Sequence, residues 1–155
     1  MKRFTDLVAE CLPHIKELFP WDLDQLRRER PDVLLLDTRE PYEFEAARID
    51  GSLNVPRGIL EAACEYGYED TVPELVRART RPVVVVCRSG NRSALAAWVM
   101  QQMGYQDVYS LKTGLRGWNN YELPLVKGDG EPLDVDSADE FFTTRLHPDQ
   151  VAPTE

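Results

Sequence analysis

The most apolar segment of the chain is a run of four valines, residues 83–86, directly before Cys87. A short, continuous, β-branched run of this kind predicts a strand that is buried on both faces. A polar loop follows, and from Ser93 apolar residues recur at helical spacing as far as Met103, with Gly104 as the expected C-cap. The pattern therefore predicts a buried strand, a cysteine, a tight loop and a helix, in that order.

Shorter apolar segments predict further strands and helices on both sides of this unit. The expected strands are 15–19 at an edge, 33–36, a short one before Pro56, 83–86 and 107–111; the expected helices are 4–12, 22–30, 41–44, 93–103 and 113–118. Asp22 with Gln25 resembles a capping box that opens the second helix. Because strands and helices alternate, we expect an α/β fold with an open, mainly parallel sheet of about five strands flanked by helices.

The chain is expected to divide into three parts, which are an N-terminal helix (1–14), a domain (15–127) and an acidic C-terminal extension (128–155). The extension holds eight acidic residues and one basic residue, so it carries −7 of the net charge of −9. Ser137 and Glu140 form a capping box before Phe141, Phe142 and Leu146, which predicts a short docked helix. That helix could dock on its own domain or on a neighbouring molecule.

Length, charge and cysteine content exclude several classes of protein. A chain of 155 residues has the size of one domain, and its net charge of −9 argues against nucleic-acid binding. Its three cysteines are too scattered for a disulfide framework, and neither metal-ligand spacings nor nucleotide-binding glycine motifs occur, so no cofactor is expected. No apolar run approaches the ~20 residues of a membrane span. The N-terminus lacks the apolar core of a signal peptide, and a reducing cytoplasm is the expected location.

Cys87 stands where the predicted strand gives way to the start of a helix. Free N–H groups at a helix start, together with the positive end of the helix dipole, form a site for anions. Such a position favours the thiolate form of a cysteine, and Arg88 and Arg92 would add positive charge. Cys87 is therefore expected to be a nucleophile at the floor of an anion cradle. The alternative is an inert cysteine at a strand end, beside arginines that face solvent.

The length of the loop distinguishes two kinds of anion chemistry. Four residues, 88–91, separate Cys87 from Arg92, whereas tyrosine-phosphatase-like sites place five residues between cysteine and arginine. The smaller ring suits a sulfur atom carried on the cysteine better than a tetrahedral phosphate. Residues 87–93, C-R-S-G-N-R-S, resemble the active loop of the rhodanese (sulfurtransferase) family, which commonly reads C-R-S-G-x-R-S. In that family the cysteine accepts a sulfane sulfur as a persulfide and passes it to a nucleophile.

Three more segments extend the resemblance to about residues 15–126. Residues 36–44 resemble the family's D-x-R-E-x-x-E-[FY] segment, and residues 49–56 resemble H-I-P-G-A-x-N-I-P. Residues 111–124 resemble the ending L-x-G-G-x-x-x-W-x-x-x-G-x-P. The departures are Arg48 for His, Asp50 for Pro, Ser52 for Ala, and Thr113 and Glu122 for glycines. These segments are specific for the fold, and only the loop at Cys87 is specific for chemistry.

Four residues outside the loop are candidates for supporting roles. Asp37 and Arg39 are expected to form a scaffold near the end of a strand rather than to act as catalysts. Arg57 lies in a P-R-G-x-L-E segment that resembles a subset of single-domain rhodaneses; it could face the loop as a third positive charge or be a solvated arginine at a helix start. Cys64 is expected to be a buried small hydrophobe, and the alternative is a resolving thiol for Cys87.

The resemblance implies a sulfurtransferase that carries sulfane sulfur as a persulfide on Cys87. The donor would be thiosulfate or a protein or low-molecular-weight persulfide, and the acceptor cyanide, a thiol or a sulfur-carrier protein. Backbone N–H groups from Arg88 to Arg92 would hold the developing negative charge, and both arginines would attract the donor. The rest of the substrate-binding loop would be Ser89, Gly90, Asn91 and Ser93, with the serines hydrogen-bonded within it. The alternatives are a module of the same fold that only binds partners, and a cysteine-dependent phosphatase or arsenate reductase.

Overall fold

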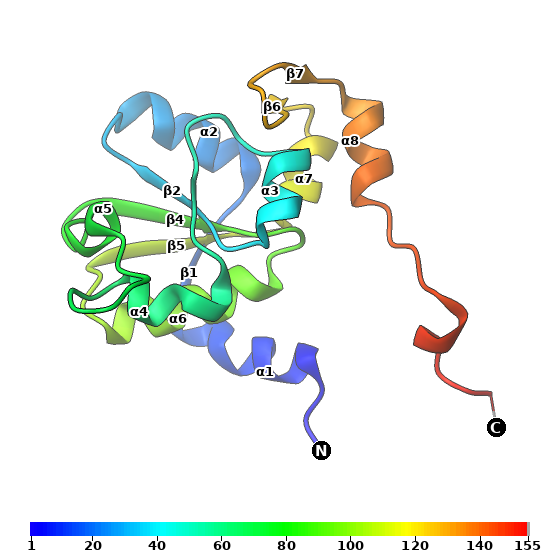
Figure 1. Cartoon of the computed structure of the whole chain (residues 1–155), viewed down its shortest axis with the longest axis horizontal. Helices are drawn as coiled ribbons and strands as arrows, with labels where there is room; N and C mark the ends of the chain where they lie inside the picture. Colours follow the sequence, from blue (N-terminus) through cyan, green and yellow to red (C-terminus); the bar gives the residue numbers. More distant parts are fainter. Residues whose placement is uncertain (155) are drawn as a thin grey trace.

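A five-stranded parallel sheet forms the centre of the molecule in the computed structural model, which describes residues 1–154 (Figure 1). The strands lie in the order β1-β5-β4-β2-β3. Their bounds are β1 Lys16–Leu18, β2 Leu34–Asp37, β3 Leu53–Asn54, β4 Pro82–Val86 and β5 Asp107–Leu111. The predicted α/β fold is confirmed, and the valine strand β4 lies at the centre of the sheet between β2 and β5.

Helices cover both faces of the sheet (Figure 1). One face carries α4 (Leu60–Ala63), α5 (Pro73–Val76) and α6 (Asn91–Gln102), and the other carries α2 (Pro20–Glu29), α3 (Pro41–Ala46) and α7 (Gly114–Asn120). Val83 and Val85 belong to the hydrophobic core on the first side, and Val84 and Val86 to the core on the second. Because both faces of β4 are buried, apolar residues occupy every position from Val83 to Val86 and do not alternate with polar ones.

The N-terminal helix α1 (Phe4–Cys11) packs against α6 outside the first core. Val8 and Cys11 are buried there, whereas Phe4 and Leu7 are exposed. The domain therefore covers only part of the apolar face that the sequence predicts. None of the helices within residues 1–154 is long and apolar enough to cross a membrane.

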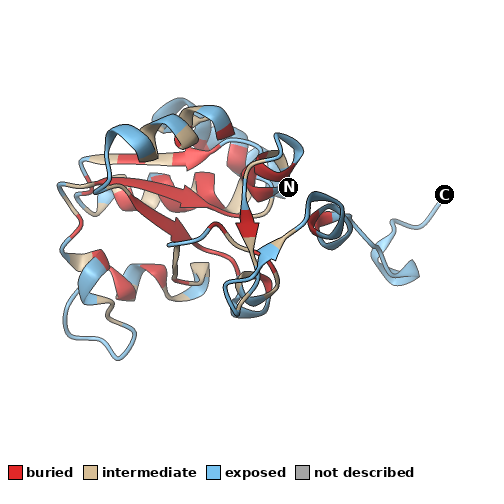
Figure 2. Cartoon of the chain, turned by 90° about the horizontal axis from the view of Figure 1, so that it is seen from above, coloured by how far each residue is buried: buried red, intermediate tan, exposed pale blue. Residues whose placement is uncertain are grey.

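The acidic extension docks on the domain through one helix. Its strand β7 (Pro132–Leu133) pairs with β6 (Leu125–Val126) at the end of the domain, and α8 (Val135–Phe142) follows. α8 packs against α7, and its Ala138 and Phe142 are fully buried in the same core as Trp118. The expected docked helix is thus confirmed, and it lies on its own domain. Leu146, expected on the helix, lies beyond its end and is exposed. Toward the C-terminus the chain extends away from the domain (Figure 2).

Two helices begin earlier than the capping-box patterns predicted. α2 begins at Pro20, and the Asp22 carboxylate in its first turn accepts a hydrogen bond from the Phe19 N–H at 3.0 Å. α8 is capped by Asp134, whose carboxylate accepts a hydrogen bond from the Ser137 N–H at 3.0 Å. The predicted starts at Asp22 and Ser137 are therefore wrong, because a proline in the first turn and an upstream aspartate already provide the geometry of a helix start.

Candidate active site

Cys87 lies in the loop between β4 and α6, and its side chain is buried. The N–H groups of Gly90 and Ser93 both donate to Sγ, at N···S distances of 3.2 and 3.3 Å. Gly90 is the N-cap residue of α6 and has a φ of +96°, in the left-handed region that favours glycine. The start of α6 thus directs two backbone donors at the sulfur, an arrangement that stabilises negative charge there.

The start of α7 supports the loop through hydrogen bonds to its backbone. The N–H groups of Leu115 and Arg116 donate to the carbonyls of Cys87 and Arg88, at 2.9 and 3.0 Å. Gly114 allows this close approach, because a Cβ at that position would lie 2.5 Å from the Arg88 carbonyl carbon and oxygen. The loop is therefore held by the N-termini of two helices. Residues at the start of α6 donate to the Cys87 sulfur, and residues at the start of α7 donate to the backbone carbonyls of the loop.

Two buried serines form a hydrogen-bonded pair beside the sulfur. The Ser93 hydroxyl lies 3.3 Å from Cys87 Sγ and 2.8 Å from the Ser110 hydroxyl on β5. A neutral thiol donates to Ser93, whereas Ser93 can donate to a thiolate while it accepts a hydrogen bond from Ser110. The expected hydrogen bonding of Ser93 within the loop is present. Ser110 was not identified from the sequence, where the only signal was a serine within a predicted strand.

Glu43 of α3 holds Arg92. The Arg92 guanidinium donates two hydrogen bonds to the Glu43 carboxylate, at 2.8 and 3.0 Å, and the Glu40 N–H donates a third at 3.0 Å. Burial alone would raise the pKa of Glu43, but the hydrogen bonds from Arg92 and Glu40 outweigh it and the pKa is lowered. The hydrogen bond to Glu43 also raises the pKa of Arg92. Glu43 lies on a predicted helix, but its contact with the loop was not identified from the sequence.

Arg88 extends in another direction, to the end of α8. Its Nη2 donates to the Phe142 carbonyl oxygen at 2.5 Å and to the Thr144 hydroxyl at 3.2 Å. The structure therefore brings both arginines of the loop into contact with elements outside it, Arg92 with α3 and Arg88 with the acidic extension.

Asp37 and Arg39 form a fully buried ion pair at the end of β2. Arg39 Nη2 donates to the Asp37 carboxylate at 2.8 Å and to the Ala47 carbonyl at 2.6 Å. The Asn54 amide donates to the carbonyls of Asp37 and Arg39, at 3.0 and 2.9 Å. These bonds join the end of β2 to β3 and to the end of α3, and they support the scaffold interpretation, which stays a prediction.

The remaining candidates make other contacts. Arg57 pairs with Glu61 one turn along the chain, at 2.7 Å, so its charge is compensated locally. Cys64 is fully buried in the first core, and burial raises the pKa of its thiol. Ser89 is exposed, and within residues 1–154 no hydrogen bond of the Ser89 or Asn91 side chain is observed. In the same range, no three Cys, His, Asp or Glu side chains are grouped so that they could hold a metal ion.

Comparisons with known sequences identify the type of domain. The chain matches the family model described as "Rhodanese-like domain" over residues 21–121. It is 31% identical over 116 residues to a "Sulfurtransferase" from Allochromatium vinosum, a match that covers 75% of this chain and 99% of that protein. It is 33% identical over 92 residues to "Thiosulfate sulfurtransferase GlpE" from Tolumonas auensis, covering 58% of this chain and 76% of that one.

A solved structure shows the same architecture. A protein of unknown function from Rhodopseudomonas palustris, described as a possible tyrosine phosphatase, is 28% identical and superposes with a TM-score of 0.73. The alignment covers 80% of this chain and 94% of that protein. α8 and the segment that follows it lie outside the family match of residues 21–121.

Proposed function

Because the chain belongs to the family of rhodanese-like domains, we propose that it transfers sulfane sulfur as a persulfide on Cys87. Its relatives support a sulfurtransferase at the level of the family. The observation that carries the proposal for this chain is the pair of N–H groups, from Gly90 and Ser93, that donate to the Cys87 sulfur. Two such donors favour the negatively charged thiolate form of Cys87.

The proposed donor is thiosulfate or a protein or low-molecular-weight persulfide. With thiosulfate, the Cys87 thiolate attacks the outer, sulfane sulfur, so that a new S–S bond forms on Cys87. The S–S bond of thiosulfate breaks, and sulfite leaves with the bonding electron pair. Ser93, supported by Ser110, turns its hydroxyl toward the charged sulfur.

The proposed acceptor is cyanide, a thiol or a sulfur-carrier protein. The acceptor attacks the outer sulfur of the persulfide, the S–S bond to Cys87 breaks, and the thiolate is restored. With cyanide the product is thiocyanate. The N–H groups of Gly90 and Ser93 stabilise Cys87 as the leaving thiolate in this second step, so one cradle serves both half-reactions.

Mass spectrometry after thiosulfate treatment tests the proposal. We expect one added sulfur, about 32 Da, on Cys87, and thiocyanate release when cyanide follows. Cys87→Ser should abolish both signals, while Cys64→Ser should change neither, since Cys64 is buried in the core. An adduct on Cys64, or one that survives Cys87→Ser, would overturn the assignment. If the folded protein takes up no sulfur and releases no thiocyanate but still binds partner proteins, the alternative of a binding module is supported.

A further inference from the structure

Arg88 differs from Arg39, Arg57 and Arg92, the three other arginines considered as site residues, in the chemistry of its partners. Each of those three pairs with a carboxylate. Within residues 1–154 no carboxylate lies at ion-pair distance from Arg88, whose acceptors are a carbonyl and a hydroxyl, both uncharged. Arg88 is therefore held in place while its positive charge remains uncompensated, next in sequence to Cys87.

The end of α8 is well suited to fix this guanidinium. Phe142 is the last residue of the helix, where carbonyls lack partners within the helix and the dipole is negative, so a cation is favoured there. The Phe142 side chain is fully buried in the second core, which gives its carbonyl a defined position. Both hydrogen bonds engage Nη2 of Arg88, and among the described residues no acceptor occupies its Nη1 or Nε.

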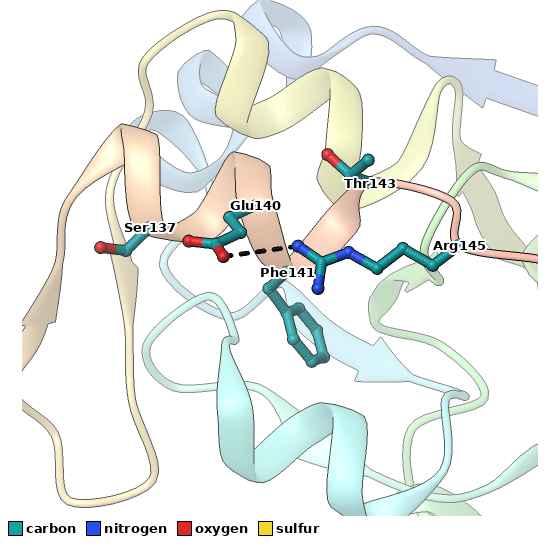
Figure 3. Close-up of a pocket in the computed structure, with 5 residues that line it drawn as sticks. All are labelled: Ser137, Glu140, Phe141, Thr143 and Arg145. Carbon is teal, nitrogen blue, oxygen red and sulfur yellow. Dashed lines mark hydrogen bonds and ion pairs between the residues drawn. The ribbon is translucent and has the colours of Figure 1, made fainter.

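Arg88 also lines a pocket beside the active loop. The pocket has a volume of about 320 Å³ and lies between α3 and the segment after α8, with Glu43, the partner of Arg92, in its wall. The other lining residues are Tyr42, Phe141, Thr143, Thr144, Arg145, Leu146 and Gln150. Phe141 points from α8 toward α3, while Arg145 turns back to pair with Glu140 at 3.4 Å (Figure 3). Arg88 thus contributes a positive charge to the wall of this pocket.

We propose that Phe142 and Thr144 are positioning residues of the active site, which fix Arg88 so that its charge receives the anionic group of the incoming sulfur donor. For the identity of the donor, this inference rests on the proposed function. It goes further because both residues lie outside the family match of residues 21–121. The acidic extension therefore supplies this chain with an element of substrate recognition.

Alkylation of Cys87 tests the positioning role without any sulfur transfer. Iodoacetate is an anion and iodoacetamide is neutral, so the ratio of their rates on Cys87, followed by mass spectrometry, reports the local positive charge. We expect Arg88→Ala to lower this ratio about three- to tenfold, and Thr144→Val about two- to fivefold. In the Arg88→Ala background Thr144→Val should have no further effect, and Thr144→Ser should keep the parent ratio.

A neighbouring threonine provides the matched control. The Thr143 hydroxyl donates to the Asp139 carbonyl within its own helix end, at 2.8 Å, so Thr143→Val should leave the ratio unchanged. Phe142→Ala, which loosens the helix end, should approach the effect of Arg88→Ala in protein whose near-ultraviolet circular dichroism shows a folded core. An effect of Thr144→Val equal to that of Thr143→Val, or one that persists without Arg88, would overturn the proposal.

Sulfur loading then connects the positioning role to the donor. Thr144→Val should raise the thiosulfate concentration for half-maximal loading of Cys87 by about two- to fivefold, with no change in the rate at which dithiothreitol, a neutral thiol, discharges the persulfide. If thiosulfate and other sulfane donors fail to load the parent protein, the proposed function fails. The alkylation ratio still decides whether Thr144 positions Arg88. Equal loading of parent and Thr144→Val would contradict the recognition of the donor through this contact.

Discussion

The Glu43 carboxylate on α3 accepts two hydrogen bonds from the Arg92 guanidinium in the active loop, although 49 positions separate the two residues in sequence. The Glu43 side chain is only 10% exposed, so removing its partner would leave a poorly solvated charge. The pair joins α3 to the loop. The electrostatics around Cys87 therefore depend on a residue outside the loop.

Glu43→Gln should lower the free energy of unfolding at neutral pH by about 1–3 kcal/mol, because Arg92 loses a charged acceptor. The pKa of Glu43 is lowered in the folded protein from its ordinary value of 4.5. The stabilisation from the pair is therefore complete above pH 4.5 and is lost as the pH falls through the folded-state pKa. Urea unfolding at neutral and acidic pH should show the parent and the variant converging as the pH falls.

The control for this prediction is the exposed Arg57–Glu61 pair. Glu61→Gln should change the free energy of unfolding by less than about 0.5 kcal/mol, as is usual for solvated ion pairs. A difference between Glu43→Gln and the parent that stays constant into the acidic range would show that the carboxylate charge is not what stabilises the fold.

Arg92→Ala should weaken the use of thiosulfate, because it removes a positive charge and leaves the Glu43 carboxylate unpaired beside the anion site. We expect kcat/KM for thiosulfate to fall about ten- to a hundredfold, mainly through KM. Adding Glu43→Gln should restore part of the loss, since no carboxylate then repels the donor. Steady-state thiocyanate release across a range of thiosulfate concentrations measures both constants.

Arg57→Ala decides between the two interpretations of Arg57 in the same assay. Its pairing with Glu61 favours a surface role, and the expected change in kcat/KM is less than about twofold. A loss as large as that of Arg92→Ala would make Arg57 a third positive charge of the site.

Unchanged kinetics in Arg92→Ala would contradict the prediction for Arg92 and assign donor binding to the backbone N–H groups and Arg88.

The central unit of the fold could be predicted because its signals are local. The four valines of β4, the cysteine after them and the apolar spacing of α6 all lie within residues 82–104. The starts of α2 and α8 were harder to predict. Phe19 precedes α2 without a side-chain cap of its own, and the aspartate that caps α8 lies three residues before the more familiar Ser137 pattern.

The contacts that complete the candidate site join residues far apart in the chain. Glu43 with Arg92, Arg88 with Phe142, and Ser93 with Ser110 are each brought together by the order of the strands and by the packing of α3 and α8. The residue types alone carry no signal for such pairs, since a glutamate on a short helix or a carbonyl at a helix end has many possible partners. The loop residues could therefore be predicted, but their supports could not.

Two residues that replace family glycines hold backbone conformations that suit glycine. Thr113 has a φ of +68° and Glu122 a φ of +59°, where a side chain with a Cβ is strained. Glu122→Gly should raise the free energy of unfolding by about 0.5–1 kcal/mol, because the relief of backbone strain exceeds the cost of the extra conformational entropy that a glycine loses on folding. Thr113→Gly should stabilise at least as much, because β-branched residues tolerate this region least.

Urea unfolding of both variants beside Glu122→Ala tests this prediction. Alanine keeps a Cβ at the same φ, so Glu122→Ala should give no gain. Equal stabilisation by alanine and glycine would show that loss of the glutamate side chain, and not relief of backbone strain, is responsible.

The structure predicts that phosphate esters are poor substrates for Cys87. Only four residues separate Cys87 from Arg92, and the N–H groups of Gly90 and Ser93 already donate to the sulfur itself. Hydrolysis of p-nitrophenyl phosphate should therefore stay at the level of Cys87→Ser, in the same preparation that takes up sulfur from thiosulfate. Turnover of the phosphate that depends on Cys87 would show that the loop holds a tetrahedral anion after all, and the phosphatase alternative would replace sulfur transfer as the function of this site.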